Sequence, residues 1–165
     1  MLKTERLYLR SFVSGDAAVM HGYRNDDSCK RYQRYEDTSL AYLQEFVRAY
    51  ADCGCLSAEE QHYAIVRDED GQMIGDVSVF FSEQERCFTL GITVAPCFQR
   101  QGYAYELLEA LTLRMRGEYP DFDIVALIEK ENEKSIALFK KLGFAEECYA
   151  ETIQSLVYVL YAEKK

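Results

Sequence analysis

Residues 89–106 combine residue types that could hold a phosphate group. They read T-L-G-I-T-V-A-P-C-F-Q-R-Q-G-Y-A-Y-E: an alternating apolar run, a proline, a short polar loop, a glycine and the start of an amphipathic pattern. The first N–H groups of a helix have no partner inside the helix, and the helix dipole is positive at that end. A strand that leads through a glycine-bearing loop into a helix is therefore typical of anion-binding sites.

Pro96 should end the strand within this stretch. Proline cannot donate a hydrogen bond to a neighbouring strand, so pairing is expected to stop near Ala95. Gly91 is a candidate position for a β-bulge. If the strand separates here from its neighbour, the N–H and C=O groups near Val94 become available to an amide chain, such as the pantetheine arm of coenzyme A.

Gly102 would let a phosphate approach the backbone closely, because glycine has no Cβ. A pyrophosphate would then be held by N–H groups from about Gln101 to Tyr105. The patterns G-x-x-x-x-G-K-[ST] and G-x-G-x-x-G are both absent from the sequence. Nucleotide triphosphates and dinucleotides are therefore not favoured as ligands.

The elements that position this stretch are predicted from hydrophobic periodicity and from capping residues. Asn132 is expected to cap a helix, and Gly143 to close it. Residues 29–37 are expected to be irregular, and serve either as packed tyrosines and arginines or as one wall of an acceptor pocket. Strands are expected at 5–12, 62–67, 72–81, 87–95, 122–128, 144–149 and 152–161, and helices at 17–23, from 37 or 38 to near 53, at 102–117 and at 132–143.

The order of these elements predicts the fold class. Strands 87–95 and 122–128 are joined by a helix, so they should be parallel with a right-handed crossover. The other strands are joined by short polar turns and should pair antiparallel. The expected fold is α+β, a mixed and mostly antiparallel seven-stranded sheet with helices on both faces, and residues 1–165 are expected to form a single domain.

Composition excludes several classes of function. The net charge is −9, from 19 basic and 28 acidic residues, and there is no basic stripe for nucleic acid. The acidic balance favours either simple solubility or the attraction of a cationic acceptor. Residues 1–6 lack the apolar core of a signal peptide, and no run approaches the ~20 apolar residues of a membrane span, so a cytoplasmic protein is expected.

The six cysteines are then expected to be reduced thiols. Cys53 and Cys55 lie near His62 in the sequence, which could indicate a metal site. Paired C-x-x-C motifs are missing, however, so no metal is expected.

Several motifs together resemble one family. Residues 99–104 resemble the Q/R-x-x-G-x-G/A signature of the GNAT superfamily of N-acetyltransferases, and 102–106 its G-Y-A-x-E form in the ribosomal-protein N-acetyltransferase-like (RimJ/RimL) branch. Residues 132–135 and 142–144 resemble the N-x-x-S and L-G-F elements of that branch, and 4–10 its T-E-R-L-Y-L-R opening. The resemblance covers essentially the whole chain.

The resemblance implies acetyl-coenzyme A as cosubstrate, with its thioester between strands 87–95 and 122–128. A neutral acceptor amine would attack the thioester directly, and the Val94 amide is the candidate donor to the oxyanion. The acceptor would be a small cationic amine, a protein N-terminus or an aminoglycoside-like sugar. The expected coenzyme-binding residues are Ile92, Thr93, Val94, Gln99, Arg100, Gln101, Gly102, Tyr103, Ala104, Tyr105, Asn132 and Ser135.

Two positions depart from the family pattern. Phe139 stands where many relatives have the tyrosine that protonates the leaving thiolate. The resemblance transfers that role to Ser135, whose hydroxyl could equally bond within the first turn of its helix. Thr89 stands where relatives often have a glutamate, and this leaves the base without an assignment.

Other residues could in principle act as the base. Glu83 and Glu85 lie in a predicted turn, where glutamates are usually solvated. His62 is more often structural at the start of a strand. An acyl-coenzyme A-binding sensor without turnover, or an interaction domain with a vestigial pocket, therefore stays as the alternative to an enzyme, and a monomer or a homodimer is expected.

Overall fold

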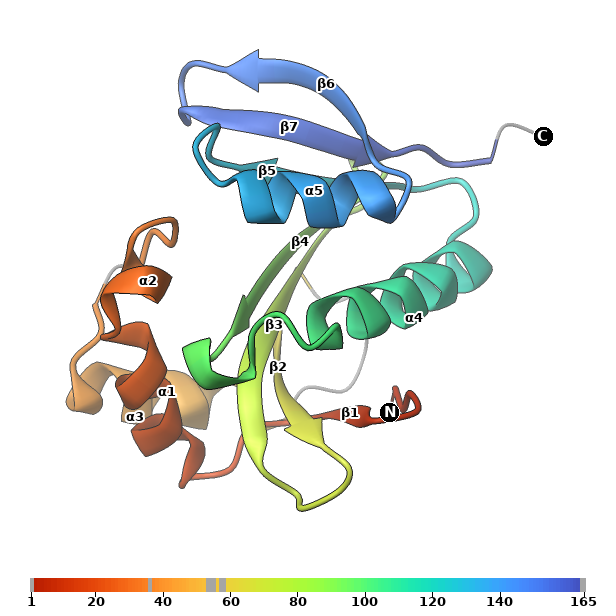
Figure 1. Ribbon diagram of the computed structural model, residues 1–165. Helices are drawn as coiled ribbons and strands as arrows, with labels where there is room; N and C mark the ends of the chain where they lie inside the picture. The colour runs from red at the N-terminus through yellow and green to blue at the C-terminus, as the bar shows by residue number, and fades with distance from the viewer. Residues whose placement is uncertain (1, 36, 53–55, 57–58, 164–165) are drawn as a thin grey trace.

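The computed structural model describes residues 2–35, 37–52, 56 and 59–163 (Figure 1). It contains a seven-stranded sheet with the order β1-β2-β3-β4-β5-β7-β6. The strands are β1 Leu7–Arg10, β2 Glu60–Arg67, β3 Met73–Ser82, β4 Cys87–Val94, β5 Asp123–Ile128, β6 Ala145–Ala150 and β7 Ser155–Leu160. The helices are α1 Asp16–Arg24, α2 Asp27–Lys30, α3 Leu40–Ala49, α4 Tyr103–Glu118 and α5 Glu133–Lys141, with a 3₁₀ turn at Pro96–Phe98.

The strand pairing confirms the predicted topology. β4 and β5 are parallel neighbours, joined through α4. The other neighbouring strands of the sheet pair antiparallel. Because β7 lies between β5 and β6, the last hairpin closes back onto the parallel pair.

Helices cover both faces of the sheet, as β2 illustrates. Ile65 packs into a core cluster with the apolar face of α4, whereas Ala64 and Val66 pack into a second cluster with α1 and α3. Successive side chains of a strand point to opposite faces, so these clusters lie on opposite sides of the sheet. Figure 1 shows α1–α3 gathered on one side and α4 and α5 on the other.

The segment after α1 differs from the prediction. Cys29 and Lys30 belong to the short helix α2, because the Asp26 carboxylate accepts a hydrogen bond from the Ser28 N–H at 2.9 Å and caps a turn there. The prediction of an irregular segment from residue 29 was therefore wrong for its first residues. Residues 31–35 that follow are irregular, as predicted.

The cap of α3 was also predicted one or two residues too early. Ser39 is the cap, and its Oγ accepts from the Tyr42 N–H at 3.3 Å. Asp37 instead accepts from the Ser39 N–H at 2.7 Å, which forms a turn ahead of the helix. The helix ends at Ala49, and the predicted end near Cys53 lies outside the described residues.

Gly91 does not mark a bulge between β3 and β4. The register passes without a shift through the pair Ser78–Gly91 up to Gly75–Val94. The other boundaries differ from the prediction by a few residues at most.

Candidate active site

β4 and β5 stop pairing before either strand ends. Their ladder runs from Cys87–Asp123 to Leu90–Ala126, although β4 continues to Val94 and β5 to Ile128. We call the unpaired part, residues 91–94 and 127–128, the ladder gap. The separation of the two strands, expected from the sequence near this position, is therefore present.

The carbonyl groups of Ile92 and Val94 face the ladder gap. The Gln33 Nε2 donates to the Ile92 carbonyl at 3.2 Å, and the Gln99 Nε2 donates to the Val94 carbonyl at 2.9 Å. In an antiparallel ladder the N–H and C=O of one residue lie on the same side of the strand, so the Val94 N–H faces the gap as well. This edge of β4 can pair with an extended chain of amides.

The loop after β4 has the backbone geometry of an anion site. Arg100 and Gly102 adopt left-handed conformations, with φ of 62° and 83°. Gly102 is the N-cap of α4, and its carbonyl accepts the first helical bond from the Glu106 N–H at 3.0 Å. The N–H groups of residues 103–105 therefore precede the helical ladder and are available to a ligand.

This loop is braced from behind by the beginning of the chain. The Glu106 carboxylate accepts bonds from the Thr4 hydroxyl at 2.6 Å, the Arg6 N–H at 2.8 Å and the Arg6 Nε at 2.6 Å. The same Arg6 donates to the Gln101 carbonyl at 3.0 Å. Burial alone would raise the pKa of Glu106, but the bonds from Thr4 and Arg6 outweigh it and lower that pKa.

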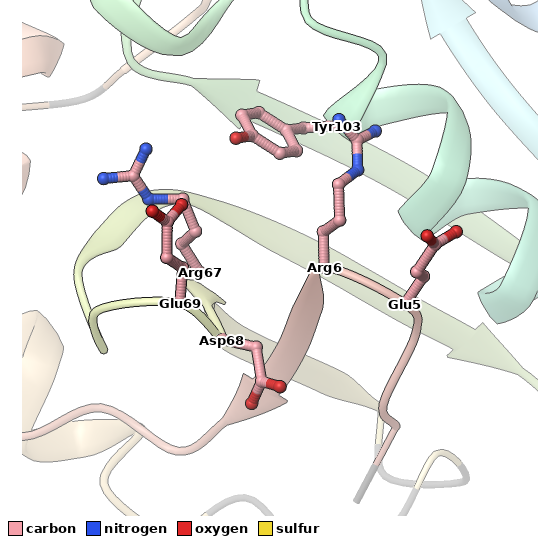
Figure 2. A pocket seen from close by; sticks show the side chains of 6 residues that line it. All are labelled: Glu5, Arg6, Arg67, Asp68, Glu69 and Tyr103. Atoms are coloured by element: carbon pink, nitrogen blue, oxygen red, sulfur yellow. The ribbon is translucent and has the colours of Figure 1, made fainter.

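Tyr103 lies on the braced side of the loop. Its ring is stacked under the Arg6 guanidinium, 4.5 Å from the ring centre. Together with Arg6, Arg67 and three acidic residues it lines a cavity of about 230 Å³, and Figure 2 shows the ring between the two arginines. The Tyr103 side chain is therefore part of the support of the loop.

Asn132 and Ser135 lie together at the start of α5. The Asn132 Oδ1 accepts from the Ser135 N–H at 3.2 Å, which confirms the predicted cap. Because β4 and β5 are parallel, the loops that follow them emerge at the same edge of the sheet. The structure thus brings the starts of α4 and α5 to the edge where the ladder gap lies.

Phe139 is buried and brings no polar group to this edge of the sheet. It is 3% exposed, and its ring packs edge-on against Phe144 with centres 5.0 Å apart. Phe139, at the position where the resemblance leads us to expect a tyrosine, is thus part of the hydrophobic core.

A buried polar cluster lies beside β4, where α1 packs over Asp76 of β3. Asp76 accepts bonds from the Tyr23 hydroxyl and from the Arg24 guanidinium, the latter at 2.9 Å. The Tyr35 hydroxyl bonds with Thr93 at 3.1 Å. Burial, followed by the nearby Asp76 charge, raises the pKa of Tyr23 well above its ordinary value, so this hydroxyl stays protonated and donates.

Sequence reasoning placed Thr93 among the coenzyme residues, but its side chain belongs to this cluster. It did not find Tyr23, Arg24 or Asp76. The only signal was an acidic residue in the strongly apolar run of β3, which is unusual for a buried strand.

The candidate bases are not at the ladder gap. Glu83 and Glu85 lie in the turn before Cys87, at the opposite end of β4 and roughly 20 Å away along the strand. Thr89 lies in the paired part of β4, opposite Val125. His62 is 7% exposed, and its Nε2 lies 2.7 Å from Glu60.

His62 is also enclosed by aromatic rings, with Tyr50 and Phe46 centred 4.4 and 4.8 Å from the imidazole. Cys53 and Cys55 lie outside the described residues. Within the part of the chain that is described, no group of three or more His, Cys, Asp or Glu could hold a metal ion. No helix among those residues is long and apolar enough to cross a membrane.

The strand gap, the left-handed loop and the cap of α5 thus lie at one edge of the sheet, and comparison with known proteins identifies the family. Residues 6–145 match the family described as "Acetyltransferase (GNAT) domain". The chain belongs to this family and is a GNAT N-acetyltransferase, as the resemblance predicted.

Individual relatives support the same assignment. The chain is 26% identical to "Uncharacterized N-acetyltransferase YnaD" of Bacillus subtilis, over 88% of this chain and 83% of that protein. A putative ribosomal-protein-serine acetyltransferase from Vibrio cholerae has a TM-score of 0.80 at 21% identity, over 96% and 95% of the two chains. The spermidine N-acetyltransferase from Vibrio cholerae, solved with CoA and spermine, has a TM-score of 0.73 at 22% identity, over 94% of each chain.

At this level of identity, the likeness to solved structures shows the fold. It confirms the α+β sheet with the parallel β4–β5 pair.

Proposed function

We propose that this protein acetylates a primary amine with acetyl-coenzyme A bound along the ladder gap. The observation that carries the proposal is the orientation of Ile92 and Val94, whose carbonyls face the gap and already accept bonds from side-chain amides. The pantetheine arm carries amides of the same kind. The residues present therefore fit the cosubstrate.

The starts of the two helices supply the remaining contacts. We place the pyrophosphate on the backbone N–H groups of residues 101–105, where the left-handed Gly102 begins the helix and Arg6 holds the loop. Gln99 and Arg100 shape this loop, and residues 103–105 form its helical turn. Asn132 and Ser135 lie beside the pantetheine or its sulfur.

The chemistry is a direct transfer. The acceptor amine attacks the thioester carbonyl, the oxyanion is stabilised by the Val94 N–H, and the thiolate leaves near the Ser135 hydroxyl. An alkylamine is mostly protonated at pH 7, with a pKa near ~10, so it must first lose a proton to a base or to a chain of water. No metal takes part.

A small cationic amine is the preferred acceptor, followed by a protein N-terminus and then an aminoglycoside-like sugar. The net charge of −9 attracts such cations. Of the similar structures named above, one is described as a spermidine N-acetyltransferase and the other as a putative ribosomal-protein-serine acetyltransferase. We further propose a cytoplasmic single-domain protein over residues 1–165, a monomer or homodimer that binds neither nucleic acid nor membrane.

The test is the release of free coenzyme A thiol from acetyl-coenzyme A in the presence of an amine panel. The panel contains polyamines, short peptides with free N-termini and aminoglycosides. The proposal is supported if at least one amine releases thiol faster than hydrolysis does and if mass spectrometry shows an added acetyl group on that amine. Absence of binding to acetyl-coenzyme A in calorimetry would overturn it and would favour an interaction domain.

A sensor that binds acetyl-coenzyme A without turnover is the second candidate. It is favoured by the burial of Phe139 and by Thr89 at the position of the glutamate. Tight binding with no thiol release across the whole panel would support the sensor.

A further inference from the structure

Residues 33–35 cross the ladder gap and attach to both of its sides. Gln33 donates to the Ile92 carbonyl and Tyr35 bonds with Thr93, both on β4. Between them, the Arg34 guanidinium donates to the backbone carbonyls of Ile153 and Gln154. Those carbonyls belong to the turn between β6 and β7, on the far side of the gap.

The backbone of this segment is held firmly by the two residues that follow Gln33. Arg34 also lies 3.4 Å from the Glu129 carboxylate, in the loop after β5. The Tyr35 ring is covered by the Arg24 guanidinium at 4.6 Å, and Arg24 is fixed by its ion pair with the buried Asp76. The Gln33 side chain can therefore move while the backbone of residues 33–35 stays in place.

The bond from Gln33 differs in kind from the bond made by Gln99. Gln99 and Val94 are five positions apart, so their bond belongs to the local geometry of the loop after β4. Gln33 and Ile92 are 59 positions apart, and no turn requires their bond. The Gln33 carboxamide places an N–H where an amide chain lying along β4 would place its own.

We propose that Gln33 is a positioning residue that occupies the Ile92 carbonyl in the free protein and yields it to an amide of the pantetheine arm. This inference rests on the proposed function, because it needs coenzyme A to bind along β4. The exchange replaces one N–H donor by another at the same acceptor.

The sign of a change in affinity tests the proposal. Calorimetric titration of coenzyme A into the full chain compares the wild type with Gln33→Leu, which keeps the bulk and removes the donor. The free protein loses one net hydrogen bond that the complex does not use, so Gln33→Leu should bind roughly two- to tenfold more tightly. Gln84→Leu, in the exposed turn before β4, is the matched control and should bind as the wild type does.

Unchanged or weaker binding by Gln33→Leu, beside a wild type that binds coenzyme A, would overturn this inference and leave the proposed function intact. A folded wild type that binds no coenzyme A would overturn both. If Gln33→Leu does not fold, the Gln33 side-chain N–H signals of the wild type decide, assigned by their loss in Gln33→Met. They should move to the position of a solvated carboxamide on saturation with coenzyme A, and signals that stay in place would refute the exchange.

Discussion

Replacement of Gly102 by valine should strongly weaken coenzyme binding at a modest cost in stability. Gly102 has a φ of 83°, a conformation that β-branched residues rarely adopt. A Cβ placed on it would lie 3.3 Å from an Arg6 guanidinium nitrogen. That guanidinium is fixed by Glu106 and by the Gln101 carbonyl, so it can give way only by loosening the support of the loop.

The two effects have different sizes. A strained backbone conformation of this kind costs about 1–3 kcal/mol, which for a chain of this length lowers the Tm by roughly 2–10 °C. Hydrogen bonds to a charged group contribute about 1.5–3 kcal/mol each, and displacement of the pyrophosphate would remove at least two of them. The affinity for coenzyme A should therefore fall by a factor on the order of 10²–10⁴.

Gly71→Val separates strain from ligand contact. Gly71 also has a positive φ, of 70°, and a Cβ there would meet no heavy atom of the described residues within 4 Å. Thermal unfolding should show a loss of stability in both variants, whereas calorimetry should show a loss of affinity in Gly102→Val alone. Wild-type affinity in Gly102→Val, or an equal loss in Gly71→Val, would refute the placement of the pyrophosphate.

The remaining predictions concern one residue each. Glu106→Gln should lower the Tm at pH 7, because it weakens the bonds from Thr4 and Arg6. The pKa of Glu106 is lowered in the folded protein, so the ionised carboxylate stabilises the fold above its ordinary pKa of 4.5, and this stabilisation is lost as pH falls through the folded pKa. The Tm values of the wild type and Glu106→Gln should therefore converge at low pH. A difference in Tm that stays constant with pH would contradict this prediction. Ser135→Ala should slow acetyl transfer and leave coenzyme affinity nearly unchanged, whereas an unchanged rate would assign Ser135 to the helix cap alone. Burial raises the pKa of the Cys29 thiol to about 11, so iodoacetamide at pH 8 should modify it more slowly than the exposed Cys97, as peptide mass spectrometry would show; equal rates would disprove it.

The elements that we propose hold the coenzyme could be predicted from the sequence because their signals are local. Pro96 ends the strand and Gly102 opens the next helix through properties of their own backbones. Asn132 caps a helix through a bond to a residue three positions away. Gly143 has a φ of 89° after α5, as expected of the residue that closes a helix. Each of these features depends on a few neighbouring residues, so it can be predicted without knowledge of the fold.

The buried polar cluster around Asp76 depends on contacts between distant residues. Asp76 is buried only because Tyr23 and Arg24, more than 50 positions earlier, reach it. A buried carboxylate needs such partners, but a strand sequence does not show whether they exist. The short helix α2 was missed for a related reason, because four residues are too few for a hydrophobic period to be visible.

The distant contacts also differ in chemical kind, and this affects which of them the sequence can reveal. At the start of α4, Arg6 and Glu106 bond side chain to side chain although they are 100 positions apart, so this contact requires both residue types. Both residues belong to segments that resemble the family. Gln33 and Arg34, in contrast, bond to the backbone carbonyls of Ile92, Ile153 and Gln154. A backbone carbonyl is present whatever its side chain, so these contacts impose no residue type on their partners. Residues 92, 153 and 154 therefore give no sign of these contacts in the sequence, and the acceptor must be identified by assay of amines against the intact site.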